Sequence, residues 1–251
     1  MSRHLTIDVE APEHLCRMAP AVYRPAEILR DVESWLDFLA GANLRCTFFV
    51  LGEVAQREPA IVKTIAAAGH EVGSHGCRHR PVQKLGTAEF REDLALSKAV
   101  LEDILGAPVR GYRSPAWTLG LAPGSYRTMV FEAGYAYSSS LLPATGFMKA
   151  PRILGAREFP PCVWRCGPWA VPAGTSWTFR LTPSERIARH LAVDERHVLV
   201  AHAHELASRR SAAELGPGAS FIRYAGTSDW REKLEGLLAP YAWRPLETLL
   251  D

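Results

Sequence analysis

The sequence has few cysteines and no marked excess of either charge. Its five cysteines are odd in number and irregularly spaced, which argues against a disulfide framework and for a reducing compartment. The formal net charge is only +2 and no basic block exceeds a few residues, so we expect neither nucleic acid nor an anionic membrane surface as a partner. Homo-oligomer formation stays open, because nothing in the composition bears on it.

We also expect neither a membrane-spanning segment nor a leader segment. No apolar run reaches the roughly 20 residues that a membrane-spanning helix needs. The first strand begins after four residues, which leaves no room for a signal peptide. We therefore expect a cytoplasmic protein without a membrane span.

The chain shows no internal repeat, low-complexity tract or dividing linker. With 251 residues, of which 47% are hydrophobic, it is long enough for one large core, so we expect a single domain over residues 1–251. An α/β barrel fits that length.

Strand and helix patterns alternate along the first half of the chain. Three times before residue 117, an apolar strand is followed by a segment with apolar residues at helical spacing, which favours a parallel sheet. Residues 141–183 are instead rich in Pro, Gly and aromatic residues, which indicates a β-hairpin excursion. The sequence predicts an incomplete or distorted (β/α) barrel of about seven parallel strands, the last at Tyr241 to Arg244.

Residues typical of a metal site follow several of the predicted strands. Asp8 and Glu10 lie two apart at the end of the first strand and face one side of an extended chain. His75 and His79 are four apart in a glycine-containing loop, so both imidazoles can face one centre, whereas the Cys77 side chain would then point away. Arg113 and His202 end two further strands. Because C-terminal strand ends gather at one rim of a barrel, we expect these residues to meet there.

Four short stretches hold these residues, in the order Thr6 to Glu10 (TIDVE), Ser74 to His79 (SHGCRH), Arg113 to Trp117 (RSPAW) and Leu199 to His202 (LVAH). In this order they resemble the motifs of the polysaccharide deacetylases of carbohydrate esterase family 4. The Asp-x-Glu of the first stretch is closest to the subclass associated with exopolysaccharide biosynthesis. The resemblance implies an incomplete (β/α) barrel and a metal-dependent hydrolase that removes acetyl groups from sugars.

The resemblance also implies roles for individual residues. It suggests Asp8 as the general base, Glu10, His75 and His79 as ligands of a divalent metal, with zinc expected, and His202 as the general acid. Because Val9 separates Asp8 from Glu10 where most members have two adjacent Asp residues, a swap of these two roles is the alternative. Arg113 would hold Asp8 in place. The family's Asp that orients the catalytic His has no counterpart, so the partner of His202 and the purpose of His204 stay open.

Four residues are candidates for binding the substrate. Pro115 and Ala116 would place a backbone N–H at the oxyanion, and Trp117 and Trp177 would stack on sugar rings. The expected partner is an N-acetylated carbohydrate: a polysaccharide, a lipid-linked precursor or a small glycoside. The alternatives are a non-sugar amide, an O-acetyl ester, or sugar binding without turnover.

Overall fold

A computed structural model describes residues 3–11, 14, 25–142, 157–166, 169–171, 174–193, 198–206 and 217–251. Its main sheet has six parallel strands in the order β5-β4-β3-β2-β1-β8. Their bounds are β1 (His4–Val9), β2 (Thr47–Val50), β3 (Glu71–Ser74), β4 (Gly111–Tyr112), β5 (Tyr137–Ser138) and β8 (Val198–His202). The α/β barrel class is confirmed, but in the described residues the predicted seventh strand makes only one parallel bridge, between Arg3 and Trp243.

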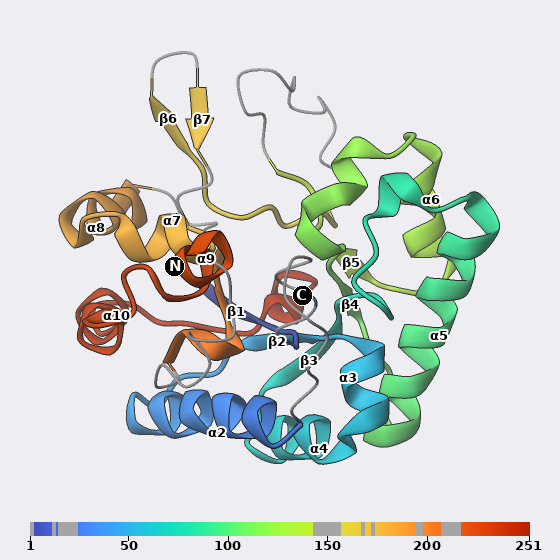
Figure 1. Cartoon of the computed structure of the whole chain (residues 1–251), viewed down its shortest axis with the longest axis horizontal. Helices are drawn as coiled ribbons and strands as arrows, with labels where there is room; N and C mark the ends of the chain where they lie inside the picture. Colours follow the sequence, from blue (N-terminus) through green and yellow to red (C-terminus); the bar gives the residue numbers. More distant parts are fainter. Residues whose placement is uncertain are drawn as a thin grey trace.

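Helices join successive strands and cover the outside of the sheet. The connections in the first half are α2 (Pro25–Gly41), α3 (Gly52–Arg57), α4 (Pro59–Ala67), α5 (Thr87–Leu105) and α6 (Ser125–Glu132), with the short 3₁₀ helices η1 (Val82–Lys84) and η2 (Pro115–Leu121). Pro59 opens α4, where its missing N–H costs nothing, and Gly106 ends α5 with a left-handed φ of 66°. Figure 1 shows α2 and α4 along one side of the sheet and α5 along another.

The second half departs from the repeating pattern. Strands β6 (Trp164–Cys166) and β7 (Trp169–Val171) form the predicted hairpin, which projects from the body in Figure 1. Residues 167 and 168, between the two strands, lie outside the described residues. The helices that follow are α7 (Ser176–Leu181), α8 (Ser184–Val193), η3 (Ala203–Leu206), α9 (Pro217–Tyr224), α10 (Trp230–Leu238) and η5 (Leu246–Leu249). The sequence pattern did not indicate α9.

The two faces of the sheet bury different side chains. In β1, Leu5, Ile7 and Val9 pack into the large core beneath the helices, so Thr6 and Asp8 face the inside of the curved sheet. That inner face holds a small apolar cluster of Phe49, Tyr137, Phe159, Val198, Val200 and Leu246. Gly73 makes room for it, because a Cβ there would lie 2.7 Å from the Phe49 ring.

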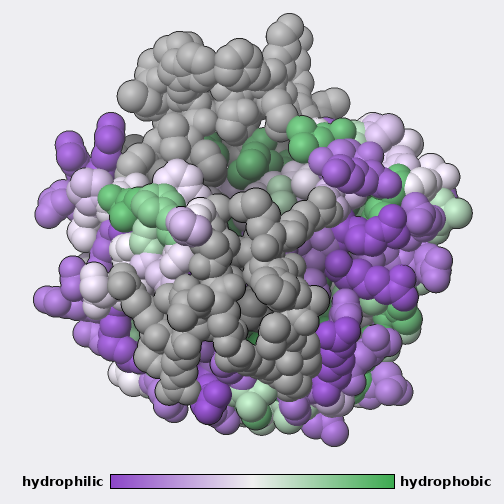
Figure 2. All heavy atoms as spheres, in the orientation of Figure 1, coloured by the Kyte–Doolittle hydropathy of each residue, from purple (hydrophilic) through white to green (hydrophobic). Residues whose placement is uncertain are grey.

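Apolar side chains from several elements are also exposed on the surface. Figure 2 shows hydrophilic residues over much of the described part of one face, with small hydrophobic patches between them. The large exposed apolar residues are Leu121, Phe131, Trp177, Leu181 and Phe221. In the described ranges, every helix is too short or too polar to cross a bilayer.

Candidate metal centre and catalytic site

Asp8 and Arg113 form a buried ion pair at the rim of the sheet. The guanidinium Nη1 of Arg113 donates to Oδ1 of Asp8 at 2.7 Å and to Oγ1 of Thr6 at 2.8 Å, and Nη2 donates to Ser139. The guanidinium also lies between the rings of Phe49 and Trp117, with its Cζ 4.2 Å and 4.7 Å from the ring centroids. The predicted Asp8–Arg113 contact is therefore present, and it fixes one carboxylate oxygen.

Glu10, His75 and His79 converge on a single point. Oε1 of Glu10 lies 2.9 Å from Nε2 of His75 and 3.1 Å from Nε2 of His79. All three side chains are at most 13% exposed. Together they form one of two groups of donor atoms, among the described residues, that could hold a metal ion; the second group is Asp8, Glu10 and His202.

The hydrogen bond on the far side of His75 tests whether a cation fits here. Nδ1 of His75 lies 3.0 Å from the carbonyl oxygen of Arg113. A carbonyl only accepts, so Nδ1 donates to it, and Nε2 is the ring nitrogen left to face Glu10. Nε2 of His75 and Oε1 of Glu10 lie 2.9 Å apart, so a proton or another cation must lie between these two atoms. In addition, Oε2 of Glu10 is buried without a hydrogen-bond partner in the described structure. The donor set therefore fits a bound cation.

The pKa shifts in this cluster agree with that argument. Burial alone would raise the pKa of Glu10, but the charge of His79 and hydrogen bonds from both histidines hold it well below its usual range. Burial alone would lower the pKa of His79, and the Glu10 carboxylate raises it instead. Both shifts show that the Glu10 carboxylate is stabilised by positive charge on its partners.

His202 reaches the same rim from β8. Its Nδ1 lies 3.2 Å from Oε1 of Glu205, and Nη1 of Arg180 donates to that same oxygen at 2.5 Å. Burial lowers the pKa of His202, but the bond to Glu205 and the charges of Glu10 and Asp8 outweigh it and raise the pKa to about 8. Glu205 is therefore the partner that the sequence left open. Its place three residues after His202 was the signal for it in the sequence, whereas nothing pointed to Arg180.

His204 does not join the site. Its ring is buried, 5.6 Å from that of His202, and its Nε2 has no hydrogen-bond partner among the described residues. Burial and the nearby Arg223 hold the pKa of His204 well below its usual value. Its ring is therefore neutral at ordinary pH.

The segment after Arg113 has an unusual backbone. Ala116 and Trp117 have φ values of 49° and 58°, in the left-handed region that glycine favours. Such non-glycine residues typically cost about 1–3 kcal/mol each and gather at functional sites. Pro115 is buried and Ala116 is exposed, while the Trp117 ring packs over Arg113. The Trp117 ring thus lies beside the ion pair of Asp8 and Arg113.

Trp177 lies on α7 and is 39% exposed beside Phe221, with the two ring centroids 6.1 Å apart. A parallel bridge between Thr175 and Val200 places the start of α7 beside the middle of β8, two residues before His202. That Trp177 contacts a substrate stays a prediction.

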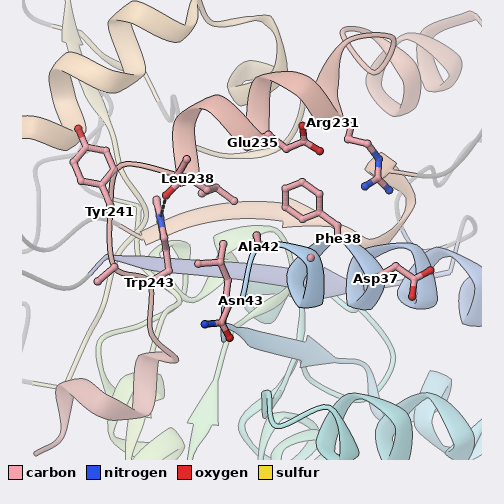
Figure 3. Close-up of a pocket in the computed structure, with 13 residues that line it drawn as sticks. Asp37, Phe38, Ala42, Asn43, Arg231, Glu235, Leu238, Tyr241 and Trp243 are labelled. Carbon is pink, nitrogen blue, oxygen red and sulfur yellow. Dashed lines mark hydrogen bonds between the residues drawn. The ribbon is translucent and has the colours of Figure 1, made fainter.

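A pocket of about 730 Å³ lies elsewhere, between α2 and α10. Figure 3 shows Phe38, Asn43, Glu235 and Trp243 around it, with Trp243 Nε1 donating to the carbonyl of Leu238. Asn43 lies on the turn that leads into β2, so this pocket is at the N-terminal edge of the sheet. The residues that line this pocket include none of Asp8, Glu10, His75, His79, Arg113 and His202.

Fold and site together define a class: a parallel α/β barrel protein with a cluster of side chains at the C-terminal ends of its strands that could hold a cation. The model of the polysaccharide deacetylase family matches residues 30–137. A peptidoglycan-N-acetylglucosamine deacetylase of Bacillus cereus is 36% identical over 80 residues, which are 32% of this chain and 29% of that protein. The chain thus spans under a third of that relative's length.

Solved structures show the same fold at low sequence identity. A family 4 carbohydrate esterase from Streptomyces lividans, in complex with acetate, has a TM-score of 0.52 at 16% identity, covering 94% of this chain and 88% of that one. A pseudoenzyme of the same family from Bacillus anthracis has a TM-score of 0.57 at 15% identity, covering 100% and 65%. Residues 30–137 thus match the polysaccharide deacetylase family, and the solved structures share the fold of the chain. Its closer resemblance to the exopolysaccharide-associated subclass stays a prediction.

Proposed function

We propose that this protein is a metal-dependent hydrolase that removes an N-acetyl group from an amino-sugar-containing substrate and releases acetate. The observation that carries the proposal is the convergence of two imidazole Nε2 atoms on Oε1 of Glu10, beside a carboxylate held by Arg113. The deacetylase named among the relatives supports the carbohydrate substrate.

The metal would be held by Glu10, His75 and His79. Two imidazoles and one carboxylate are a common protein ligand set for catalytic zinc, which makes zinc the expected ion. When bound, such an ion lowers the pKa of water and polarises the acetyl carbonyl. Glu10 suits the ligand role better than Asp8, because its oxygen touches both rings while Asp8 lies 4.0 Å from Nε2 of His75.

The remaining residues divide the proton transfers between them. Asp8, fixed through Oδ1 by Arg113, takes the proton of the attacking water on its other oxygen. The N–H of Ala116 faces the oxyanion that forms on the acetyl carbonyl. His202, held by Glu205, then donates its proton to the departing amine. Trp117 and Trp177 would contact the sugar.

The test compares three substrates on one preparation of the purified protein. We expect acetate release from N-acetylglucosamine oligomers, loss of that activity after the metal is chelated, and its recovery when zinc is added back. Faster turnover of a ureide or of an O-acetylated xylan would place the chain with the alternative hydrolases. Tight binding of the oligomers with metal present and no acetate release would identify a sugar-binding protein without turnover.

A further inference from the structure

The turn between His75 and His79 is held by backbone hydrogen bonds on both sides. The first turn of α3 donates to its carbonyls, from Gly52 N–H to Gly76 at 2.9 Å and from Glu53 N–H to Cys77 at 3.0 Å. Gly76 N–H in turn donates to the Ser74 hydroxyl. The turn contains left-handed φ values at Gly76 (76°) and His79 (50°), so it needs external contacts to keep this shape.

One side chain closes the remaining side of the turn. Asp93 lies on α5, and its Oδ2 accepts the N–H of Cys77 at 3.0 Å. The same carboxylate accepts the N–H of Arg78. A Cβ built on Gly76 would lie 3.0 Å from Oδ2, so the carboxylate packs directly against the turn. Asp93 therefore fixes the two residues that separate the histidines.

The two histidines depend on this turn to different degrees. His75 is anchored without it, because its backbone N–H donates to Val50 and its Nδ1 bonds the carbonyl of Arg113. In the described part of the chain, the hydrogen bond found for the His79 ring is the one with Glu10, and the ring is more exposed than that of His75. The direction of the His79 ring is therefore set mainly by the turn itself.

We propose that Asp93 is a positioning residue of the metal centre: through the Cys77 and Arg78 N–H groups it holds the turn that aims His79 at the point shared by Glu10 and His75. The inference rests on the metal centre of the proposed function. A carboxylate suits the task because it offers acceptor oxygens to two N–H groups at once. An asparagine keeps one oxygen and sets an amide donor against the other N–H group.

The experiment measures metal affinity in Asp93→Asn and Asp93→Ala, with Asp103→Asn as the matched control. Asp103 is exposed on the same helix, so this variant makes the same charge change away from the turn. The readouts are the zinc dissociation constant from competition with a chelator, the visible spectrum of the cobalt(II) form, and the melting temperature of the metal-free protein. None of them requires turnover.

We expect Asp93→Asn to raise the zinc dissociation constant about tenfold or more, as loss of groups that orient metal ligands does. The cobalt spectrum should change with it, while Asp103→Asn matches the wild type. Asp93→Asn keeps the size of the side chain. Its zinc dissociation constant therefore tests the proposal even if Asp93→Ala does not fold. Wild-type affinity and spectrum in Asp93→Asn would overturn the proposal, as would a lower metal-free melting temperature with unchanged zinc affinity.

Failure of this inference can be told apart from failure of the proposed function. If the wild-type protein binds zinc and loses affinity in Asp93→Asn but releases no acetate, the positioning role stands and the deacetylase proposal falls. If the wild-type protein releases acetate and Asp93→Asn binds zinc as tightly, only the positioning role falls.

Discussion

Nδ1 of His202 lies 3.2 Å from Oε1 of Glu205, three residues further along the chain. The side chain of Glu205 is fully buried, and Arg180 on α7 donates to the same oxygen. Because the carboxylate binds the Nδ1 side of the ring, Nε2 is left facing the side of Asp8 and Glu10. This pair therefore sets the direction in which His202 can give up a proton.

Glu205→Gln should impair His202 selectively. We expect kcat for an N-acetylated amino sugar to fall at least tenfold, since a positioned proton donor is typically worth about 10² to 10⁴ in rate. Hydrolysis of 4-nitrophenyl acetate should change little, because its leaving group departs without a proton. The measurement is kcat for both substrates.

Glu235→Gln, an exposed change on α10, is the control for this comparison. If Glu205→Gln lost the same factor in kcat for the N-acetylated amino sugar and for 4-nitrophenyl acetate, Glu205 would support the structure of the site and not the proton donor His202.

The two carboxylates of the first strand should respond differently to removal of their charge. Asp8→Asn should keep the metal and lose activity by about 10² to 10⁴, because the amide keeps the shape but cannot accept the proton of water. Glu10→Gln should bind metal more weakly. Metal content and kcat of the two variants, measured side by side, check the assignment. A metal-free Asp8→Asn together with a loaded but inactive Glu10→Gln would mean that the roles are swapped.

Glu71 should make the stability of the protein depend on pH. It lies at the start of β3, buried against the hydroxyls of Thr47 and Tyr137 and the backbone N–H of Glu247. Burial outweighs these hydrogen bonds and raises the pKa of Glu71 to about 7. Between its ordinary pKa of 4.5 and 7, the folded state holds the proton more tightly than the unfolded state, so stability falls as pH rises through this window.

Glu71→Gln removes this titration. The free energy of unfolding of the wild type, relative to that of the variant, should fall by about 3 kcal/mol between pH 4.5 and pH 8. Denaturant unfolding of both proteins at several pH values measures it. A difference between the two proteins that stays constant with pH would contradict the shift.

The positions of Asp8, Glu10, His75, His79 and Arg113 could be predicted from the sequence because each follows a strand with a clear apolar pattern. Parallel strands place such residues at one edge, so topology alone brought them together. The contact between Asp8 and Arg113 was predicted from the family resemblance, together with the place of both residues at strand ends.

Other features depend on contacts that the local pattern does not encode. Arg180 lies on a short helix within the region read as a hairpin excursion, and it meets Glu205 only through the packing of α7 against β8. Helix α9 was missed because Pro217 and Gly218 at its start are typical of irregular chain. The seventh strand was expected at Tyr241 to Arg244, where the structure has one bridge, between Arg3 and Trp243. The indole N–H of Trp243 donates to the carbonyl of Leu238 at the end of α10.

The central claim is that Glu10, His75 and His79 hold the ion on which acetate release depends. The most direct measurement is metal content and acetate release for the wild type, His75→Ala and His79→Ala, with circular dichroism to show that the fold is kept. We predict about one ion per wild-type chain, and little metal and no turnover in either folded variant. Full metal content and full activity in either variant would contradict the claim.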